Sequence, residues 1–345
     1  MAYAVLQKGR FDDFIVALAA QRKVMAPVSK GYGHFEFEEV RSATEIALRY
    51  IPTILPPKKY FMPQRETILQ YTSDSIEAVV DFDPMAIFGV HTCDLAGIQC
   101  LNMVFSERPK DYNYLVRKNN IIIIGLECGD YCDQYASCAM MNSEMPNGGY
   151  DLFVTEFDEY LLFHVSTQTG EDIVKSTGLF ETADASHKSR LAEYRKKKKS
   201  IFKKELPIDS KDIALLFDKC FESKVWDELN DRCLACGNCN NVCPTCYCFD
   251  VIDEPALDLT SGVRYRRWDS CQLETFARVA GGANFRENRG ARQRHRYYRK
   301  FSYPVKKFFR YFCTGCGRCS RACMANIRLK DVLMDLIKAH PLDNA

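Results

Sequence analysis

The sequence reads Cys233-Leu-Ala-Cys-Gly-Asn-Cys-Asn-Asn-Val-Cys-Pro244 early in its last third and Cys313-Thr-Gly-Cys-Gly-Arg-Cys-Ser-Arg-Ala-Cys323 near its end. Both stretches have the spacing C-x2-C-x2-C-x3-C, which places three thiolates around one face of a 4Fe–4S cube. Where a protein holds two such cubes, the fourth cysteine of each run binds the other cube. The two stretches therefore predict a domain with two iron–sulfur clusters.

The crossed binding pattern divides the eight cysteines between two cubes. Cluster one is assigned Cys233, Cys236, Cys239 and Cys323. Cluster two is assigned Cys313, Cys316, Cys319 and Cys243. Each x2 interval needs a tight turn, and Gly237, Gly315 and Gly317 tolerate the positive φ angles that such turns require. Backbone N–H groups of these loops are expected to point at the sulfurs.

Zinc or a redox disulfide is the alternative for a single C-x2-C pair. Structural zinc sites use separated pairs of ligands and not runs of four cysteines, so two complete runs favour iron–sulfur cubes. The second run has Met324 where the first has Pro244, a difference that affects the turn and not the ligands.

Composition sets the class of protein. The chain has 345 residues, 47% of them apolar, which is enough for two domains with ordinary cores. A secreted disulfide framework is one alternative for its seventeen cysteines. However, the first ten residues contain no apolar signal core, and the run Ile121–Leu126 is too short to span a bilayer. We therefore expect a soluble protein of a reducing, anaerobic cytoplasm.

The overall fold is expected to be α+β. Residues 1–190 are predicted to form an α/β domain, with helices at Phe11–Ala20 and Ala96–Phe105. Short β-branched runs at Met85–Val90, Ile121–Leu126 and Tyr160–Val165 predict strands, the first two within a βαβ unit. A mostly helical, ferredoxin-like domain with two 4Fe–4S clusters is predicted to follow at residues 227–345.

Two basic stretches need an explanation. Residues 191–226 are predicted to form a basic helical linker, with a helix at Ile213–Trp226 leading into the first cysteine run. Residues 261–310 form a basic insert with fourteen Lys/Arg residues and three acidic ones. Nucleic-acid binding is one reading of both stretches. For the insert, the alternative is that it folds back over the anionic clusters and stabilises them, or docks an acidic partner.

Four cysteines of the N-terminal domain are candidate ligands of a third 4Fe–4S cluster: Cys93, Cys128, Cys132 and Cys138. Cys93 and Cys128 each follow a predicted strand, and parallel strands would place both at the same edge of the sheet. The alternative is that they are small buried residues, a common role for cysteine. Cys100 and Cys220 are expected in the core.

Three further cysteines have two readings. Cys246, Cys248 and Cys271 either pack around the cubes or contribute to another metal site. The six histidines are scattered and suggest no metal dyad or nucleophile pair. Gly31-Tyr-Gly33 lacks both the third glycine and the preceding strand of a dinucleotide-binding fingerprint, which argues against NAD binding by that route.

The stretch Cys233–Phe249 resembles the iron–sulfur subunit family that anaerobic sulfite reductase shares with soluble NiFe sulfhydrogenase, in which it is the beta subunit. The same resemblance extends to Trp268-Asp-Ser-Cys-Gln272, Val279-Ala-Gly-Gly-Ala-Asn-Phe-Arg286, the basic run up to His295, Gly89-Val-His-Thr-Cys-Asp-Leu95 and Gly125-Leu-Glu-Cys128. It covers nearly the whole chain.

The resemblance implies a non-catalytic electron relay. Such a protein passes electrons from a reductase subunit, which binds flavin and NAD(P), to a separate catalytic subunit, or in the reverse direction. The chain departs from the family pattern at Ala283, where a His is expected, and at Met324, where a Pro is expected. The residues before Cys138 lack the family's Cys-x-Cys, so Cys132 is taken as the replacement ligand.

Two other functions remain open from the residues. The chain could itself be catalytic, with a flavin or a substrate bound in the N-terminal domain. It could also be a nucleic-acid-binding iron–sulfur protein, in which case its affinity for nucleic acid would depend steeply on salt. The terminal substrate is not encoded in these motifs.

Overall fold

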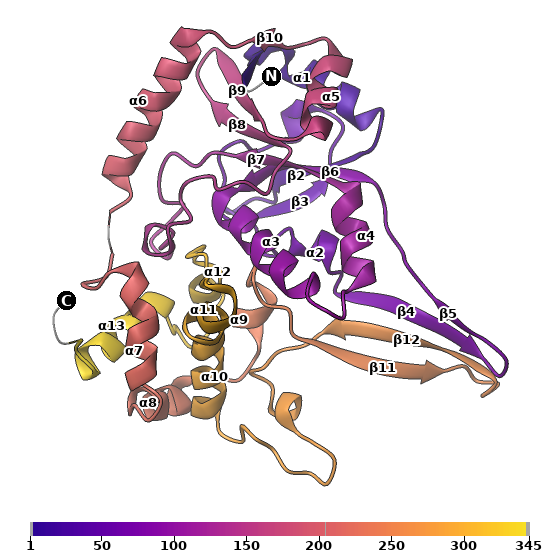
Figure 1. The fold of residues 1–345 in the computed structure, drawn as a ribbon, viewed down its shortest axis with the longest axis vertical. Helices are drawn as coiled ribbons and strands as arrows, with labels where there is room; N and C mark the ends of the chain where they lie inside the picture. Colours follow the sequence, from indigo (N-terminus) through magenta and orange to yellow (C-terminus); the bar gives the residue numbers. More distant parts are fainter. Residues whose placement is uncertain (1–2, 204, 343–345) are drawn as a thin grey trace.

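An eight-stranded mixed sheet forms the centre of the N-terminal half (Figure 1). The computed structural model describes residues 3–203 and 205–342. From one edge to the other, the strands are β10 (Glu181–Thr182), β1 (Tyr3–Gln7), β9 (Tyr160–Val165), β8 (Leu152–Glu156), β7 (Ile121–Leu126), β6 (Met85–His91), β2 (Lys23–Ser29) and β3 (Phe35–Glu39).

The middle of this sheet is parallel. Strand β6 pairs with β2 on one side and β7 on the other, and β7 pairs in turn with β8. Strand β7 reads Ile-Ile-Ile-Ile-Gly-Leu and is buried along its whole length. Such β-branched, continuously apolar sequence is typical of a strand that is covered on both faces. The strands predicted from this pattern at residues 85–90, 121–126 and 160–165 are confirmed.

Helices cover the sheet and build most of the C-terminal region. Those of the N-terminal half are α1 (Phe11–Ala19), α2 (Lys58–Phe61), α3 (Thr92–Phe105), α4 (Tyr112–Asn120), α5 (Gln168–Thr177) and α6 (Ala185–Ile201). Those that follow are α7 (Ile213–Lys219), α8 (Val225–Arg232), α9 (Asn238–Asn241), α10 (Arg289–Phe301), α11 (Tyr303–Phe308), α12 (Arg318–Arg321) and α13 (Leu329–Ala339).

Helix α3 makes the crossover between β6 and β7 and confirms the predicted βαβ unit. It begins at Thr92, directly after the last residue of β6, four residues before the predicted start. Its Leu95, Ile98 and Leu101 are buried in the core of the sheet. Because the helix starts at the carboxyl end of β6, the side chains of its first turn lie at the sheet edge where β7 also ends.

A second sheet joins the two halves of the chain. Its strand order is β11 (Phe249–Pro255), β12 (Ser261–Trp268), β4 (Arg65–Thr72) and β5 (Ile76–Ala78). Strand β12 pairs antiparallel with β4, so a hairpin that follows the first cysteine run completes a sheet begun in the N-terminal half. In Figure 1 the four strands form an arm that extends away from the body of the molecule. The C-terminal range is therefore not only helical.

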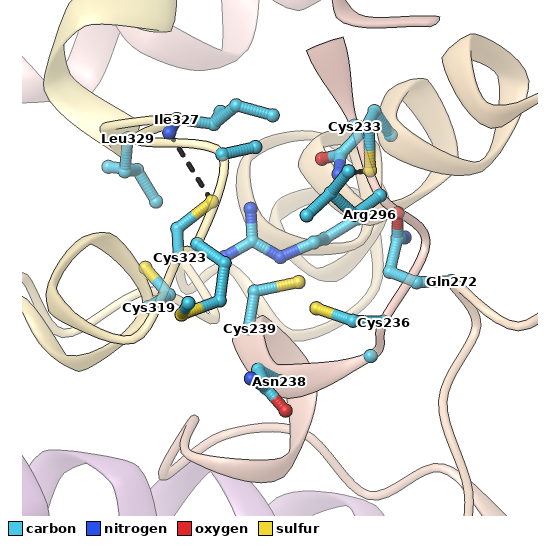
Figure 2. A pocket seen from close by; sticks show the side chains of 15 residues that line it. Cys233, Cys236, Asn238, Cys239, Gln272, Arg296, Cys319, Cys323, Ile327 and Leu329 are labelled. Carbon is cyan, nitrogen blue, oxygen red and sulfur yellow. Dashed lines mark hydrogen bonds between the residues drawn. The ribbon is translucent and has the colours of Figure 1, made fainter.

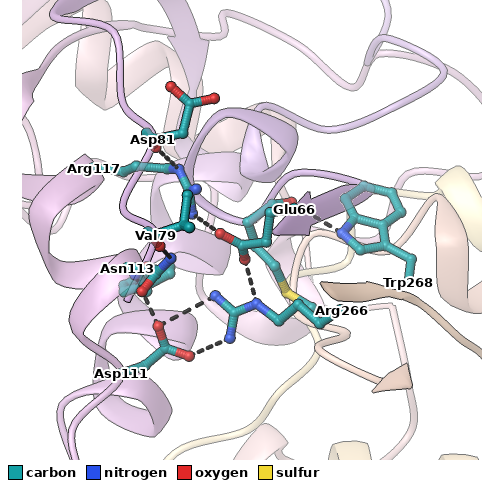
Figure 3. A network of polar contacts seen from close by, with 10 residues as sticks. Glu66, Val79, Asp81, Asp111, Asn113, Arg117, Arg266 and Trp268 are labelled. Atoms are coloured by element: carbon teal, nitrogen blue, oxygen red, sulfur yellow. Dashed lines mark hydrogen bonds and ion pairs between the residues drawn. The ribbon is translucent and has the colours of Figure 1, made fainter. Parts of the chain in front are cut away.

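Buried ion pairs fix the base of this arm (Figure 3). Arg266 of β12 is 4% exposed and binds the carboxylates of both Glu66 and Asp111. Arg117 of α4 contacts Glu66 at 2.5 Å and donates through Nε to the Asp81 carbonyl at 2.9 Å. Since each buried charge has an opposite partner, the network ties the C-terminal hairpin to the helix that precedes β7.

The basic helix α6 packs on the sheet and is not solvated on all sides. Its Arg195 and Lys198 bind the fully buried Glu127 carboxylate at 3.0 and 3.2 Å, and Leu191 is buried beside them. These cations therefore neutralise the carboxylate of Glu127, which directly follows β7. This internal role accounts for part of the basic stretch without a nucleic-acid partner.

The predicted helix at Ile213–Trp226 is wrong as a single element. The structure has α7 ending at Lys219 and α8 starting at Val225. The Trp226 indole N–H donates to the Cys220 carbonyl at 2.7 Å across the break. Within residues 3–203 and 205–342, no helix combines the length and the apolar character needed to cross a bilayer.

Candidate iron–sulfur centre

The two cysteine runs fold into matching loops. Ala235 and Gly315, at equivalent positions, have φ angles of 53° and 62°, and Gly237 and Gly317 have φ angles of 79° and 75°. A one-turn helix follows each pair, α9 in the first run and α12 in the second. The three glycines adopt the positive φ predicted for them. Ala235 reaches the same region without being a glycine, which costs backbone energy.

A pocket beside the first run is lined by five cysteines: Cys233, Cys236, Cys239, Cys319 and Cys323. Figure 2 shows their sulfurs around one shared space, with the Arg296 guanidinium group between them in the view. Four of the five are the cysteines predicted for cluster one. The loop geometry thus brings Cys323, from the end of the second run, to the three thiols of the first.

A second pocket is lined by the four cysteines predicted for cluster two: Cys243, Cys313, Cys316 and Cys319. Here it is Cys243, the last cysteine of the first run, that joins the second. Cys319 lines both pockets, so the two sites are neighbours. Each pocket therefore contains a C-x2-C-x2-C face and the last cysteine of the other run, and the first pocket also includes Cys319.

Hydrogen-bond donors point at the sulfurs of the first pocket. The Ala235 N–H lies 3.4 Å from the Cys233 sulfur, and the Ile327 N–H lies 3.3 Å from the Cys323 sulfur. The Gln293 side-chain amide donates to Cys233 at 3.0 Å. N–H···S bonds stabilise thiolates and tune the potential of the cluster they hold, so these residues fit an anionic iron–sulfur cube.

Helix α10 from the basic insert covers both pockets. Arg296 lines the first pocket and the second, and it is 4% exposed. Its Nε has no hydrogen-bond partner among the described residues. A buried guanidinium N–H next to several thiols is matched to an anionic ligand in that space. The expectation that the basic insert folds back over the clusters agrees with this position.

Lys300 adds a second buried cation on the same helix. Its ammonium group lies 3.2 Å from the Cys246 sulfur and 2.7 Å from the Thr245 hydroxyl. Burial opposes its charge, but the neighbouring Cys243 and Cys246 thiols hold the pKa of Lys300 above its usual range. Lys300 therefore stays protonated beside the second pocket.

A loop of the N-terminal half packs against the second run. The Ser137 N–H donates to the Gly315 carbonyl at 2.7 Å, and the Ser143 hydroxyl donates to the Thr314 carbonyl at 2.5 Å. A Cβ atom at Gly315 would lie 2.2 Å from the Ser137 carbonyl oxygen. Glycine is thus required at position 315 by close approach as well as by its φ angle.

A buried ion pair also links the two halves at this place. Arg318 binds Asp94 through two contacts of 2.6 and 2.8 Å, and its Nε donates to the Thr53 carbonyl at 2.6 Å. Asp94 follows Cys93 in the sequence, and Arg318 precedes Cys319. The pair therefore holds the first turn of α3 against the second cysteine run.

The four candidate cysteines of the N-terminal half are brought close together. Cys93 lies in the first turn of α3, Cys128 follows β7, and Cys132 and Cys138 lie in the next loop. The Cys128 and Cys132 side chains are hydrogen-bonded to each other, which lowers the pKa of Cys128 and raises that of Cys132. Cys93 and Cys138 are near enough to raise the pKa of Cys132 further.

A cavity of about 550 Å³ opens beside these cysteines, at the carboxyl ends of β6 and β7. Cys128, Cys132, Glu127 and His91 are among the residues that line it. Burial lowers the pKa of His91 to about 3, so this imidazole is neutral and stacks on the Tyr50 ring at 3.9 Å. The position of the cavity is the one expected for a ligand site in an open parallel sheet.

The remaining cysteines fall into two groups. Cys100 and Cys220 are fully buried, as expected for core residues. Cys246 lies next to Cys243, and Cys248 lies between Cys246 and Cys271 in a chain of contacts. In the part of the chain that the structure describes, no three His, Cys, Asp or Glu side chains are grouped tightly enough for a single metal ion.

Sequence reasoning missed several residues around the cysteines. Asp94 and Arg318 each adjoin a candidate ligand in the sequence. A charged residue next to a ligand could have indicated an ion pair at the site. Asn240 lies within the first run, where it was treated only as one of the residues that separate Cys239 from Cys243. Lys58, whose ammonium donates to the Cys246 carbonyl at 2.9 Å, is the first residue of α2, far away in the sequence, and gave no signal.

Comparisons with known proteins agree with this geometry. Residues 232–327 match the family described as a 4Fe-4S dicluster domain, so this region carries two 4Fe–4S clusters. The beta subunit of sulfhydrogenase 2 from Pyrococcus furiosus is 35% identical over 334 residues, a match that covers 96% of this chain and 98% of the relative. No solved structure shows significant similarity to the chain. The chain therefore belongs to the family of sulfhydrogenase beta subunits.

Proposed function

We propose that the chain relays electrons as the iron–sulfur subunit of a hydrogenase or sulfur-reductase complex. The observation that carries this function is the pair of adjacent cysteine-lined pockets that share Cys319 and Arg296. Each 4Fe–4S cube, when bound, takes up and releases one electron. The residues of the chain hold the cubes, neutralise their charge and separate them from water.

The ligand assignment follows the pockets. Cluster one is held by Cys233, Cys236, Cys239 and Cys323, and cluster two by Cys313, Cys316, Cys319 and Cys243. The charge on both is balanced by Arg296, and Lys300 contributes beside cluster two. Because Arg296 has no other partner for its Nε, it would donate to the clusters without giving up a protein contact.

A third cluster would extend the relay into the N-terminal half. Cys93, Cys128, Cys132 and Cys138 are its proposed ligands. Two contacts support a position next to cluster two: the Arg318–Asp94 ion pair and the bond from Ser137 to Gly315. In this arrangement the three clusters form one continuous path, with cluster two in the middle.

The two ends of this path suit two different partners. At the first pocket Cys236 is exposed, and the rim residues Leu234 and Met324 are 61% and 78% exposed. At the other end, the cavity beside Cys128 opens to solvent. We propose that one end faces a reductase subunit that binds flavin and NAD(P), and that the other faces a separate catalytic subunit.

The relative's name also supports a multi-subunit setting. A beta subunit of a sulfhydrogenase is by its name one of several subunits. Exposed apolar residues around a cluster, such as Leu234 and Met324, are typical of a surface that a partner covers. These residues would exclude water from the contact through which electrons pass.

Iron and acid-labile sulfide per polypeptide test this function in anaerobically purified protein. About twelve irons are expected if all three clusters are present, and about eight if only the two C-terminal cubes are. Cys128→Ala should remove about four irons, whereas Cys220→Ala, which changes a buried thiol remote from the pockets, should remove none. Fewer than about eight irons in the unchanged protein would contradict the assignment.

Electron paramagnetic resonance distinguishes a relay from a catalyst. The dithionite-reduced chain should show signals of reduced cubes, contain no tightly bound flavin and turn over no acceptor when it is alone. Tightly bound flavin together with turnover by the isolated chain would contradict the relay and support a catalytic N-terminal domain.

A further inference from the structure

Three cysteines outside both runs gather at the base of the C-terminal hairpin. Cys248 immediately precedes β11, and Cys271 follows β12 by three residues. The strand ladder ends with Phe249 opposite Trp268, and the Asp269 N–H then donates to the Cys248 carbonyl at 3.0 Å. The hairpin thus places Cys248 opposite Asp269, two residues before Cys271, where its strands meet the body of the molecule.

The two side chains contact each other directly. The Cys248 and Cys271 side chains interact with each other strongly enough to shift both pKa values, and Cys271 is 5% exposed. Interacting thiol groups on segments that a paired backbone holds together need little movement to form a disulfide. The third cysteine, Cys246, points instead to Cys243 and Lys300.

Polar groups around Cys271 favour its thiolate. The Asn240 side-chain amide donates to the Cys271 sulfur at 2.9 Å, and the Gln272 side-chain amide lies 3.5 Å from it. The bond from Cys248, the two amides and the positive charge of Arg296 lower the pKa of Cys271 to about 6. A thiolate with N–H donors next to a thiol is the arrangement found in redox-active dithiols.

Asn240 also links this pair to cluster one. It follows the ligand Cys239 in the sequence, and its Oδ1 lies 3.8 Å from the Cys239 sulfur while its Nδ2 donates to Cys271. One amide side chain therefore touches a cluster ligand and the thiol pair. Electrons on cluster one are separated from Cys271 by this single residue.

We propose that Cys248 and Cys271 form a redox-active dithiol–disulfide pair that stores two electrons received from the clusters. In the oxidised state a bond joins the two sulfurs. Reduction breaks the S–S bond, consumes two electrons and two protons, and leaves two thiols. The electrons arrive one at a time through the cubes, so this inference rests on the proposed relay function.

The pairwise contacts of the three cysteines favour a dithiol over a further metal site. Cys271 interacts with Cys248, whereas Cys246 interacts with Cys243 and Lys300, so the three cysteines divide into a pair and a single residue. Burial keeps the pair away from large external substrates, which suits an internal electron store.

Differential alkylation tests the pair in the full chain under anaerobic conditions. One sample is oxidised with thionine and the other is reduced with dithionite. Both are denatured, alkylated and digested. We expect a disulfide-linked peptide containing Cys248 and Cys271 in the oxidised sample only. Cys248→Ser and Cys271→Ser should abolish it, and Cys220→Ser should not.

A reductive titration gives a second readout. The unchanged protein should take up two electrons more per chain than either serine variant, at unchanged iron content. Two results would overturn the inference: both cysteines staying alkylatable after oxidation of the cubes, or iron lost from Cys248→Ser, which would make Cys248 a metal ligand. If dithionite does not reduce the cubes, the relay function is contradicted instead of the dithiol inference. The spectrum of the cubes alone shows whether they are reduced.

Discussion

The eight C-terminal cysteines and the four N-terminal ones reach their sites in different ways. In the C-terminal runs, local spacing sets the geometry, and the turns at Gly237 and Gly317 have nearly the same φ angle. In the N-terminal half, Cys93 and Cys128 come together only because two parallel strands end at one edge of a sheet. Each site of the first kind takes three of its four cysteines from one eleven-residue run, whereas the second kind depends on a whole domain being folded.

The removal of one cysteine from each site should give the largest difference in stability between the C-terminal and the N-terminal sites. Cys316→Ala is expected to lose about four irons and to lower the urea midpoint of the dicluster region markedly, because metal binding there is part of folding. Cys132→Ala should lose a similar amount of iron but leave the circular-dichroism unfolding of the sheet nearly unchanged, since its apolar core is independent of the site. Equal destabilisation by both changes would contradict the difference between the two kinds of site.

The ion pair between Asp94 and Arg318, which connects the two sites, gives the next test. Asp94→Ala removes the partner of Arg318, whose side chain is 1% exposed, and should reduce the free energy of unfolding by about 3–5 kcal/mol. Asp218→Ala breaks the exposed pair with Lys306, which is only 2.7 Å long, and should cost at most about 1 kcal/mol. Chemical denaturation of the three proteins measures the difference, and similar midpoints for both variants would contradict it.

Glu127→Gln tests the N-terminal site without touching a cysteine. The change leaves Arg195 and Lys198 without a carboxylate partner and should cost about 1–3 kcal/mol, most of it in the docking of α6. Hydrogen exchange should therefore rise in residues 185–201 and stay unchanged in the second cysteine run. Faster exchange throughout the dicluster region would show that the two sites are more tightly coupled than their contacts imply.

The smallest expected effect compares the two runs themselves. Ala235→Gly makes the first loop match the second, where Gly315 occupies the equivalent position, and relieves a left-handed alanine. Greater freedom of the unfolded chain offsets part of this gain, so we expect a net stabilisation of about 0.5 kcal/mol with unchanged iron content. A loss of stability would mean that the alanine methyl group makes contacts that outweigh the strain.

Local patterns carried most of what could be predicted. The β-branched run Ile121–Leu126 indicated its strand with correct bounds, and the spacing of the cysteines brought Cys323 and Cys243 to the expected pockets. The strand signal is local, and the pairing of the two runs follows from a local spacing that occurs twice.

Long-range contacts could not be predicted in this way. The pairing of β12 with β4 and the bond between Arg318 and Asp94 join residues about two hundred positions apart. The break between α7 and α8 was missed because no Gly or Pro lies in residues 213–226 to mark the end of a helix, while a hydrogen bond from Trp226 stabilises the turn between them. Such features depend on which distant surface an element meets, and a single sequence does not contain that information.

The arm strands also set an order of events during synthesis. Strand β4 leaves the ribosome long before its partner β12, and at ordinary elongation rates the interval is roughly 10–40 s. During that time one edge of β4 is unpaired, and the Asp94 carboxylate has no Arg318 to meet. An open strand edge invites pairing with other chains. We therefore expect newly made protein to depend on chaperones until the last hundred residues emerge, and fragments that end before the hairpin to aggregate.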